Sequence, residues 1–416
     1  MATSLSSSGF YMTILVVWVL VFPFVNCQDT SPSEEKYEEM KKYLATVNKP
    51  AVRNFTNQYD DIFDCVDINK QPAFDNPLLK DHKIQLQPSS LLLEMQNKSS
   101  SSSYIAMKIE VAEESCPPGT VPIRRIRMEE LLRAGSVANY RNKYGRAGEN
   151  PFSNQEATHQ HAVLRIDTGG PYYGTEVGLN LWNPKVDRNY GQVFSLAQFW
   201  MTNDQQGILN TIEGGWHVYP QIYGNDATHL FIYWTANKYQ TGCHNLECGF
   251  VQVHQSIMPG LAFPVVSSPD DGIQPGVILK VIRDPGTGSW WLGFEEAYTS
   301  GFVWIGYWPS TLFHSLNYGA THVSWGGEVC SQNSPGFFPP MGSGQWAQSE
   351  YGKAAFVNKI RIARSDYVLV DAPDDLGPQE TKPNCYTVVD KGNDVGNFGR
   401  FFYFGGPGGY YCGNKM

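Results

Sequence analysis

Two glutamates stand out because each lies in an apolar, aromatic stretch beside a pair of glycines. Glu213 lies in Thr211-Ile212-Glu213-Gly214-Gly215-Trp216, and Glu328 lies in Trp325-Gly326-Gly327-Glu328-Val329. A carboxylate on a buried strand is costly unless it is neutralised, paired or functional. Two carboxyl groups at one place share a proton, so that one serves as acid and the other as base. We therefore interpret these glutamates as a candidate catalytic pair. The alternative is structural burial of each beside an Arg or Lys.

The signatures of several other chemistries are missing from the sequence. It contains no His-Glu-x-x-His, no Gly-x-Ser-x-Gly, no P-loop and no dinucleotide fingerprint. The segment Cys243-His244-Asn245-Leu246-Glu247-Cys248 carries metal-capable side chains, but a small disulfide-closed loop is the favoured interpretation. We expect no metal and no other cofactor.

Composition indicates a globular, strand-rich chain. Of its 416 residues 17% are charged and 13% aromatic, and the 40 glycines and 26 prolines favour short strands joined by turns. The net charge of −9 argues against a nucleic-acid partner, since no basic face would offset phosphate repulsion. We expect a monomer.

The N-terminus resembles a secretory signal. The run Tyr11 to Val25 is almost wholly apolar and the chain becomes polar at Gln28. This run is shorter than the roughly 20 residues of a membrane-spanning helix. We predict a signal peptide over residues 1–27, a secreted, extracellular protein and no stable membrane insertion.

Residues 28–150 differ from the rest of the chain in their predicted secondary structure and composition. Ser33 to Asn48 predicts one exposed amphipathic helix, a second helical pattern surrounds Met128 to Leu132, and Ser99 to Ser103 predicts a flexible loop. Two N-glycosylation sequons begin at Asn54 and Asn97. The polar stretch from about Asn142 to Glu156, which includes Lys143 and Arg146, is the best candidate for a linker.

Beyond this linker the pattern is that of an all-β domain. Short apolar or alternating runs, separated by Gly, Pro, Asn and Asp, predict strands of an antiparallel sandwich or barrel. These runs are Ala162–Ile166, Val177–Trp182, Phe194–Met201, Gly215–Ile222, His229–Thr235, Phe250–His254, Val277–Ile282, Ser289–Phe294, Phe302–Trp308 and Ala320–Ser324.

Eight cysteines suggest a disulfide framework in an oxidising compartment. Proximity along the chain suggests the pairs Cys65–Cys116, Cys243–Cys248 and Cys385–Cys412, although sequence alone does not fix connectivity. Cys27 would leave with the signal peptide, so Cys330 remains single, two residues after Glu328. We do not favour it as a nucleophile, because no Cys/His signature surrounds it.

Four aromatic residues near the two glutamates could line a cleft that accepts proline, since rings stack well on a flat pyrrolidine. For each of them the core of the sandwich is the favoured location. They are Trp216, Tyr219, Tyr233 and Trp325.

The sequence resembles the plant neprosin family along most of its length. In the C-terminal region the resemblance is carried by Ile212 to Pro220, His229 to Ala236, Thr241 to Leu246, Gly249 to Val253, Trp290 to Leu292, Gly306 to Ser310, Trp325 to Val329 and Met341 to Gly344. In the N-terminal region it is carried by Gln71 to Lys80 and Cys116 to Ile123.

This resemblance implies a secreted zymogen of a glutamic endopeptidase that cuts on the carboxyl side of proline. It implies an activation peptide over residues 28–150 that inhibits the enzyme, and a lectin-like antiparallel β-sandwich peptidase domain over residues 151–416. The catalytic glutamates map onto Glu213 and Glu328, and the family's disulfides onto Cys243–Cys248 and Cys385–Cys412. The expected partner is a proline-containing peptide or protein, cleaved at acidic pH.

Two other classes of protein stay open. A two-glutamate glycosidase also needs a pair of carboxyl groups. A catalytically silent carbohydrate-binding module of the cell wall would keep the sandwich and need no perturbed carboxylates.

Overall fold

The computed structural model describes residues 33–97, 114–141, 143, 159–269, 274–295, 302–332, 337–394 and 398–410. The expected signal peptide, the serine run Ser99 to Ser103, Cys412 and most of the predicted linker lie outside these residues. Lys143 is the linker residue that is described.

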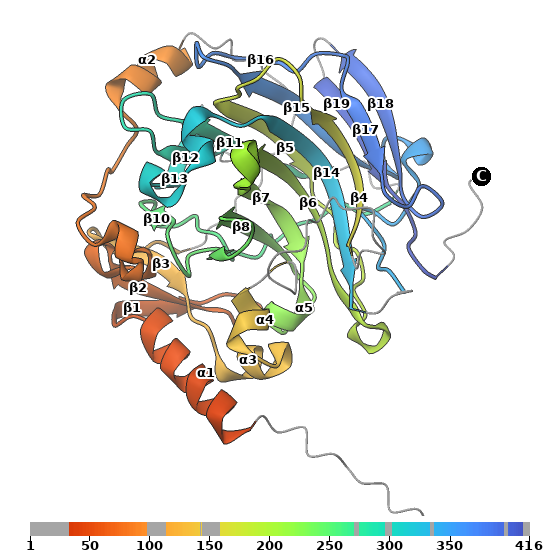
Figure 1. Ribbon diagram of the computed structural model, residues 1–416. Coiled ribbons are helices and arrows are strands. Elements are labelled where there is room, and N and C mark those ends of the chain that lie inside the picture. Colours follow the sequence, from red (N-terminus) through yellow and green to blue (C-terminus); the bar gives the residue numbers. More distant parts are fainter. Residues whose placement is uncertain are drawn as a thin grey trace, which may run out of the picture.

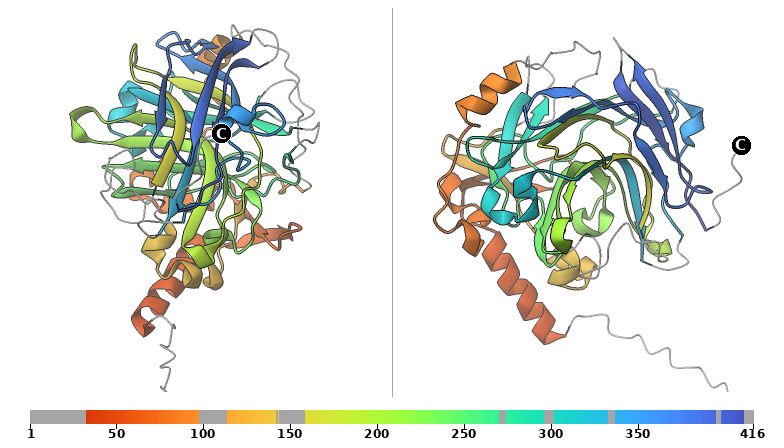
Figure 2. Two further views of the ribbon diagram at one scale, coloured as in Figure 1. Left: turned by 90° about the vertical axis from the view of Figure 1, so that its right-hand side faces the viewer. Right: turned by 45° about the horizontal axis from the view of Figure 1, so that its top comes forward.

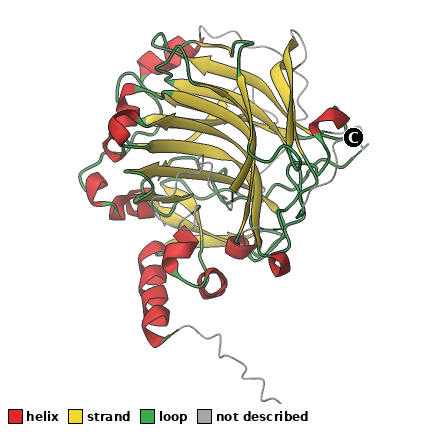
Figure 3. Ribbon diagram, turned by 45° about the vertical axis from the view of Figure 1, so that its right-hand side comes forward, coloured by secondary structure: helices red, strands yellow, loops and turns green. Residues whose placement is uncertain are grey.

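Two large antiparallel sheets pack face to face and form the body of the molecule (Figures 1 and 3). The seven-stranded sheet has the order β17 (Gly377–Glu380), β4 (His159–Ile166), β14 (His322–Ser331), β6 (Gln192–Asn203), β7 (Asn210–Val218), β8 (Thr228–Ala236) and β9 (Thr241–His244). The nine-stranded sheet has the order β10 (Val251–Gln252), β13 (Phe302–Trp308), β12 (Trp290–Glu295), β11 (Gly276–Arg283), β5 (Gly174–Asn180), β15 (Ala355–Ala363), β19 (Gly399–Gly405) and β18 (Thr387–Asp394), with β16 (Leu369–Asp371) beside β15. The prediction of an antiparallel sandwich is confirmed.

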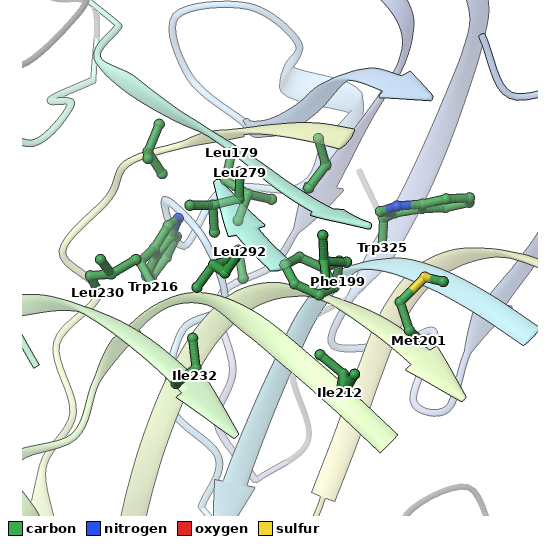
Figure 4. Packing of buried hydrophobic residues seen from close by; sticks show 14 of the residues in the cluster. Leu179, Phe199, Met201, Ile212, Trp216, Leu230, Ile232, Leu279, Leu292 and Trp325 are labelled. Carbon is green, nitrogen blue, oxygen red and sulfur yellow. The ribbon is translucent and has the colours of Figure 1, made fainter. Parts of the chain in front are cut away.

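The space between the sheets holds the main hydrophobic core. Figure 4 shows Phe199 and Trp216 of the seven-stranded sheet beside Leu279 and Leu292 of the other sheet. Trp216 donates its indole N–H to the carbonyl of Asn180, and Trp325 donates to Thr175 Oγ1. These two tryptophans are therefore core residues, which is the location that the sequence favoured for them. They do not line a cleft.

The N-terminal region is a smaller mixed α/β unit. Its sheet has the order β1 (Ala51–Thr56), β2 (Ile62–Asp67) and β3 (Thr120–Arg124), and its helices are α1 (Glu34–Val47), α2 (Ser90–Asn97), α3 (Met128–Ala134) and α4 (Val137–Arg141). The predicted helices correspond to α1 and α3. Ser33 caps α1 by accepting a hydrogen bond from the Lys36 amide.

Helical turns elsewhere are short. The sandwich contributes α5 (Pro220–Tyr223), and single 3-10 turns lie at Ile68–Lys70, Pro72–Asp75, Pro77–Leu79, Arg188–Tyr190, Gln205–Gly207, Ser310–Leu312, Ser315–Tyr318 and Ala347–Ser349. Within the described residues no helix combines the length and apolarity needed to cross a membrane.

The N-terminal unit covers the face of the seven-stranded sheet that points away from the main core. Figure 1 shows α3 and α4 beneath this sheet, and the right-hand view of Figure 2 shows α1 projecting beyond it. A second hydrophobic cluster joins Met40, Leu131 and Val137 of the N-terminal unit to Phe194 and Phe231 of the sheet. Because both faces are covered, β6 and β7 are buried along their whole lengths.

The cysteines agree with the expected framework wherever the structure describes them. Cys65 is bonded to Cys116 and Cys243 to Cys248. Cys385 is also disulfide-bonded, while its expected partner lies outside the described residues. Cys330 is a buried free thiol. Asn54 is exposed on the edge strand β1, and the side chain of Asn97 lies outside the described part; glycosylation of both stays a prediction.

Candidate active site

Strand register brings the two glutamates to the same face of the seven-stranded sheet. Strand β6 lies between β7 and β14, with Trp200 opposite Glu213 and Leu196 opposite Glu328. Because side chains alternate along a strand, Leu196, Gln198 and Trp200 share that face with both glutamates. The carboxyl groups thus approach each other over Gln198, which is midway between them on β6.

Two glycines keep the strip beside Gln198 open. Gly215 of β7 and Gly326 of β14 are its direct neighbours across the two ladders. A Cβ at Gly215 would lie 2.0 Å from the Ala197 carbonyl oxygen. Gly326 has a φ of +140°, and a Cβ there would lie 2.4 Å from the Ala162 oxygen. The backbone here accepts only glycine without moving, which explains one glycine of each Gly-Gly pair.

Glu213 is held by neutral donors of its own sheet. Gln198 Nε2 donates to Glu213 Oε2 at 2.9 Å, and Thr211 Oγ1 donates to Glu213 Oε1 at 3.0 Å. All three side chains are buried. These bonds fix the plane of the carboxyl group and turn Oε2 toward Glu328.

Glu328 is held by histidine. His159 Nδ1 lies 2.7 Å from Glu328 Oε1, and His161 Nε2 lies 3.8 Å from the same oxygen. Burial favours the protonated form of Glu328, but Lys143 and the two histidines outweigh it and lower its pKa to about 2. Burial lowers the pKa of His161 to about 4, so this ring is neutral at neutral pH.

Lys143, which follows α4 of the N-terminal unit, reaches between the two carboxyl groups. Its Nζ donates to Glu213 Oε2 at 2.6 Å and to Gln198 Oε1 at 3.0 Å, and forms an ion pair with Glu328 Oε2 at 3.0 Å. The rings of Phe194, Trp200 and Phe231 surround this ammonium group at 5.9, 5.7 and 5.6 Å. The residue is only 3% exposed.

The two contacts of Lys143 set an upper limit on the distance between the carboxyl groups of Glu213 and Glu328. Both Oε2 atoms contact one nitrogen, so they are at most 5.6 Å apart, the sum of the two contact distances. One water molecule or one peptide carbonyl could contact both carboxyl groups at this separation. The two glutamates that the sequence singled out are therefore brought together, and the Lys partner considered as the alternative is present as well.

Sequence reasoning missed most of the surrounding residues. Gln198 and Trp200 lie in an apolar strand where nothing marked them, and Lys143 was assigned to a linker. His159 and His161 carried a usable signal, since a His-x-His pair at a strand start places both rings on one face. The structure also puts His159 Nε2 3.5 Å from Cys330 Sγ, a Cys/His contact that the local sequence does not reveal.

Comparison with protein families decides the relationship. A Neprosin family model matches residues 191–407, and a Neprosin activation peptide model matches residues 55–165. The chain belongs to the neprosin family. The activation-peptide match includes Lys143 and ends within β4, so the neprosin domain supplies both glutamates and the activation peptide supplies the lysine between them. This combination is that of a peptidase made as a zymogen.

Proposed function

We propose that this neprosin is a secreted zymogen of a glutamic endopeptidase, with Glu213 and Glu328 as its catalytic pair and cleavage on the carboxyl side of proline. The observation that carries the proposal is the convergence of two buried glutamates on one lysine of the activation peptide. Such a buried pair of carboxyl groups is what an acid–base peptidase needs.

In the proposed reaction the pair acts on one water molecule. The ionised glutamate takes a proton from the water, whose oxygen attacks the scissile carbonyl carbon. The protonated glutamate polarises the carbonyl oxygen and then gives its proton to the leaving nitrogen. Gln198 donates to Glu213 and borders the same space, so it keeps that carboxyl group oriented during the transfer.

Lys143 is the residue proposed to keep the zymogen inactive. Its ammonium group occupies the space between the carboxyl groups, forms an ion pair with each, and lowers the pKa of Glu328. A pair without a proton has no general acid, and a pair filled by a side chain has no room for water. Inhibition by the chain's own activation peptide is therefore both steric and electrostatic.

The proline preference rests on the family resemblance and on rings of the covered face. Tyr219 and Tyr233 lie in the cluster on this face, and Tyr233 is directly opposite Glu213 in the ladder. When the activation peptide leaves, these rings would border the catalytic pair, where a pyrrolidine could stack on them.

The test is the activity of Glu213→Gln and Glu328→Gln, prepared separately and matured in trans by wild-type enzyme. Each should lose at least a hundredfold in hydrolysis of a proline-containing peptide, because the amide can neither take nor give the proton. Glu350→Gln is the matched control, since its carboxylate pairs with Lys391 at the surface. Substantial activity in either Glu213→Gln or Glu328→Gln would contradict the proposal that the two glutamates form a catalytic pair.

A retaining glycosidase is the second candidate that a specific observation favours. Its two carboxyl groups are about 5–5.5 Å apart, within the bound of 5.6 Å found for the pair, whereas inverting enzymes need about 6.5–9.5 Å. Assay of the matured protein on a glycan panel separates the two, since cleavage of glycans and not peptides would overturn the peptidase proposal.

A further inference from the structure

We propose that His159 is the positioning residue that makes the two glutamates unequal, holding Glu328 as the ionised base so that Glu213 carries the shared proton. This inference rests on the proposed peptidase function and deepens it, because the pair by itself does not say which member is acid and which is base.

Strand register fixes the contacts of His159. It lies directly opposite Cys330 in the β4–β14 ladder. His161, two residues further along β4 and on the same face, lies opposite Glu328. Nδ1 of His159 is 2.7 Å from Glu328 Oε1, and its Nε2 is 3.5 Å from Cys330 Sγ. The ring also packs against Phe194 at a centroid distance of 5.7 Å. With both nitrogens engaged, the imidazole is fixed in place.

Among the described residues of the seven-stranded sheet, the partners of the two glutamates differ in charge. Glu213 receives hydrogen bonds from an amide and a hydroxyl, both neutral. Glu328 contacts His159 at hydrogen-bond distance. Burial works against a charged imidazole, but Cys330 and Glu328 outweigh it and raise the pKa of His159 to about 10. A cation thus favours the ionised form of Glu328 more than that of Glu213.

The activation-peptide match covers both Lys143 and His159, but the fold places His159 to stay when Lys143 leaves. His159 opens β4, which pairs with β14 at eight positions and with β17 on its other side. Loss of this strand would open the seven-stranded sheet, so processing must cut the chain before residue 159. After maturation the pair loses its shared lysine and keeps its histidine.

The roles then follow with protons balanced. Glu328 takes a proton from water through Oε2, the oxygen that faces Lys143 in the zymogen, while the water oxygen bonds to the carbonyl carbon. Glu213 gives its proton to the leaving nitrogen as the C–N bond breaks, yielding a carboxylic acid and an amine. Transfer of the proton from Glu328 back to Glu213 restores the starting state.

The groups that face His159 define its test. Among the described residues they are Glu328 and Cys330 of β14, His161 of β4 and the ring of Phe194 on β6. His159→Asn places an amide nitrogen near the position of Nδ1, so it keeps the donor and removes the charge. A purely structural role would be rescued by this variant, whereas an electrostatic role would not.

The experiment is the pH profile of kcat for matured His159→Asn against wild type. Without the imidazolium the pKa of Glu328 rises, so the acidic limb should move upward by about one pH unit or more, which is about tenfold in kcat at a pH on that limb. KM should change little. An unshifted acidic limb, with Glu213→Gln and Glu328→Gln inactive, overturns the role of His159 and leaves the peptidase proposal intact.

Two further measurements address a nucleophilic role of Cys330 and the case in which His159→Asn does not fold. Cys330→Ser should retain most of the activity, because its hydroxyl group can still contact His159 Nε2 and Glu328 still contacts Nδ1, while the altered contact moves the acidic limb in the same direction as His159→Asn. Complete loss of activity would point instead to a Cys330–His159 nucleophile and overturn the inference. If His159→Asn does not fold, nitrogen NMR of the histidines in matured Glu213→Gln still decides. His159 should be doubly protonated at pH 7, and a neutral ring there contradicts the inference.

Discussion

Lys143 makes the two interpretations of the glutamates, a catalytic pair or structural burial beside a cation, compatible with each other. A buried glutamate beside a lysine is ordinarily structural, and a pair of buried glutamates is ordinarily functional. Here one lysine serves both glutamates, and it belongs to the segment that the family comparison matches to an activation peptide. Under the proposed function, the ion triad is structural in the zymogen and becomes a catalytic pair only when Lys143 is withdrawn.

Replacement of Lys143 by methionine should weaken latency. The two carboxyl groups would then face each other without the cation that they share, so one of them binds a proton. Removal of one partner from a buried ion pair costs roughly 3–5 kcal/mol, at least about a hundredfold in the docking equilibrium of the activation peptide.

The measurement is self-maturation of the full chain from pH 4 to 7, followed by gel and N-terminal sequencing. Lys143→Met should mature faster and up to a higher pH than wild type. Lys36→Met is the control, because Lys36 is exposed on α1. Maturation of Lys143→Met at the wild-type rate would show that latency lies elsewhere in the interface.

The strands around β6 depend on glycine beside the two glutamates. Gly215→Ala should destabilise the fold by on the order of 1–3 kcal/mol, because the new methyl group would push β7 away from the Ala197 carbonyl of β6. Thermal unfolding of the Glu213→Gln chain, with and without this change, measures the effect. Gly377→Ala is the matched control, since its Cβ would lie no closer than 3.7 Å to any neighbour. Equal melting temperatures for the two alanine variants would contradict the close approach.

The strands were predictable where local patterning decides the structure. Runs such as Phe194–Met201 and His229–Thr235 fall within β6 and β8, because alternation and β-branched or aromatic content are local properties. The run predicted to end at Ser324 continues through Glu328 to Ser331, since the glycines that interrupt the apolar pattern are accommodated by the ladders of β4 and β6.

The other components of the site depend on contacts that a linear pattern does not contain. Lys143 meets Glu213 across 70 positions of the chain, and His159 meets Glu328 across 169. Composition could show that two carboxylates needed partners, but not which residues would supply them. In the same way, alternation predicts that Trp216 of β7 and Tyr219, just after its end, lie on opposite faces of the sheet. Only the fold shows which of the two faces belongs to the main core.

The activation peptide covers a sheet face rich in histidine. His217, His229 and His244 lie on this face, and burial lowers the pKa of each, that of His244 to about 3. His229 Nε2 faces Asp61 of the activation peptide at 3.5 Å. At the edge of the same interface Tyr43 of α1 donates to Glu247, a carboxyl group whose pKa burial raises to about 7. Docking therefore holds several ionisable groups in their neutral forms.

These shifts predict that acid loosens the zymogen. A histidine whose pKa is lowered in the folded state contributes stability that is lost as pH falls below its unfolded value of about 6.5. His161, with its pKa near 4, acts in the same direction, and Glu328, with its pKa near 2, adds to the loss below about pH 4.5. Glu247 acts oppositely, because its raised pKa gives stability at low pH that is lost as pH rises toward 7. His159, whose pKa is raised to about 10, contributes stability that is already present below about pH 6.5 and does not offset this loss. The four histidines with lowered pKa values outweigh Glu247, so stability should fall from pH 6.5 to pH 4.5.

The full chain carrying Glu213→Gln, which by the proposed mechanism does not mature itself, allows this to be measured by urea unfolding at each pH with tryptophan fluorescence. The urea midpoint should fall between pH 6.5 and pH 4.5, and addition of His244→Gln should reduce the fall by on the order of 1–3 kcal/mol in unfolding free energy. His314→Gln, at an exposed histidine, should leave it unchanged. A midpoint that is constant or rises toward pH 4.5 would mean that the buried histidines do not set the pH response. Maturation in acid would then have to begin at the catalytic pair itself, through protonation against Lys143.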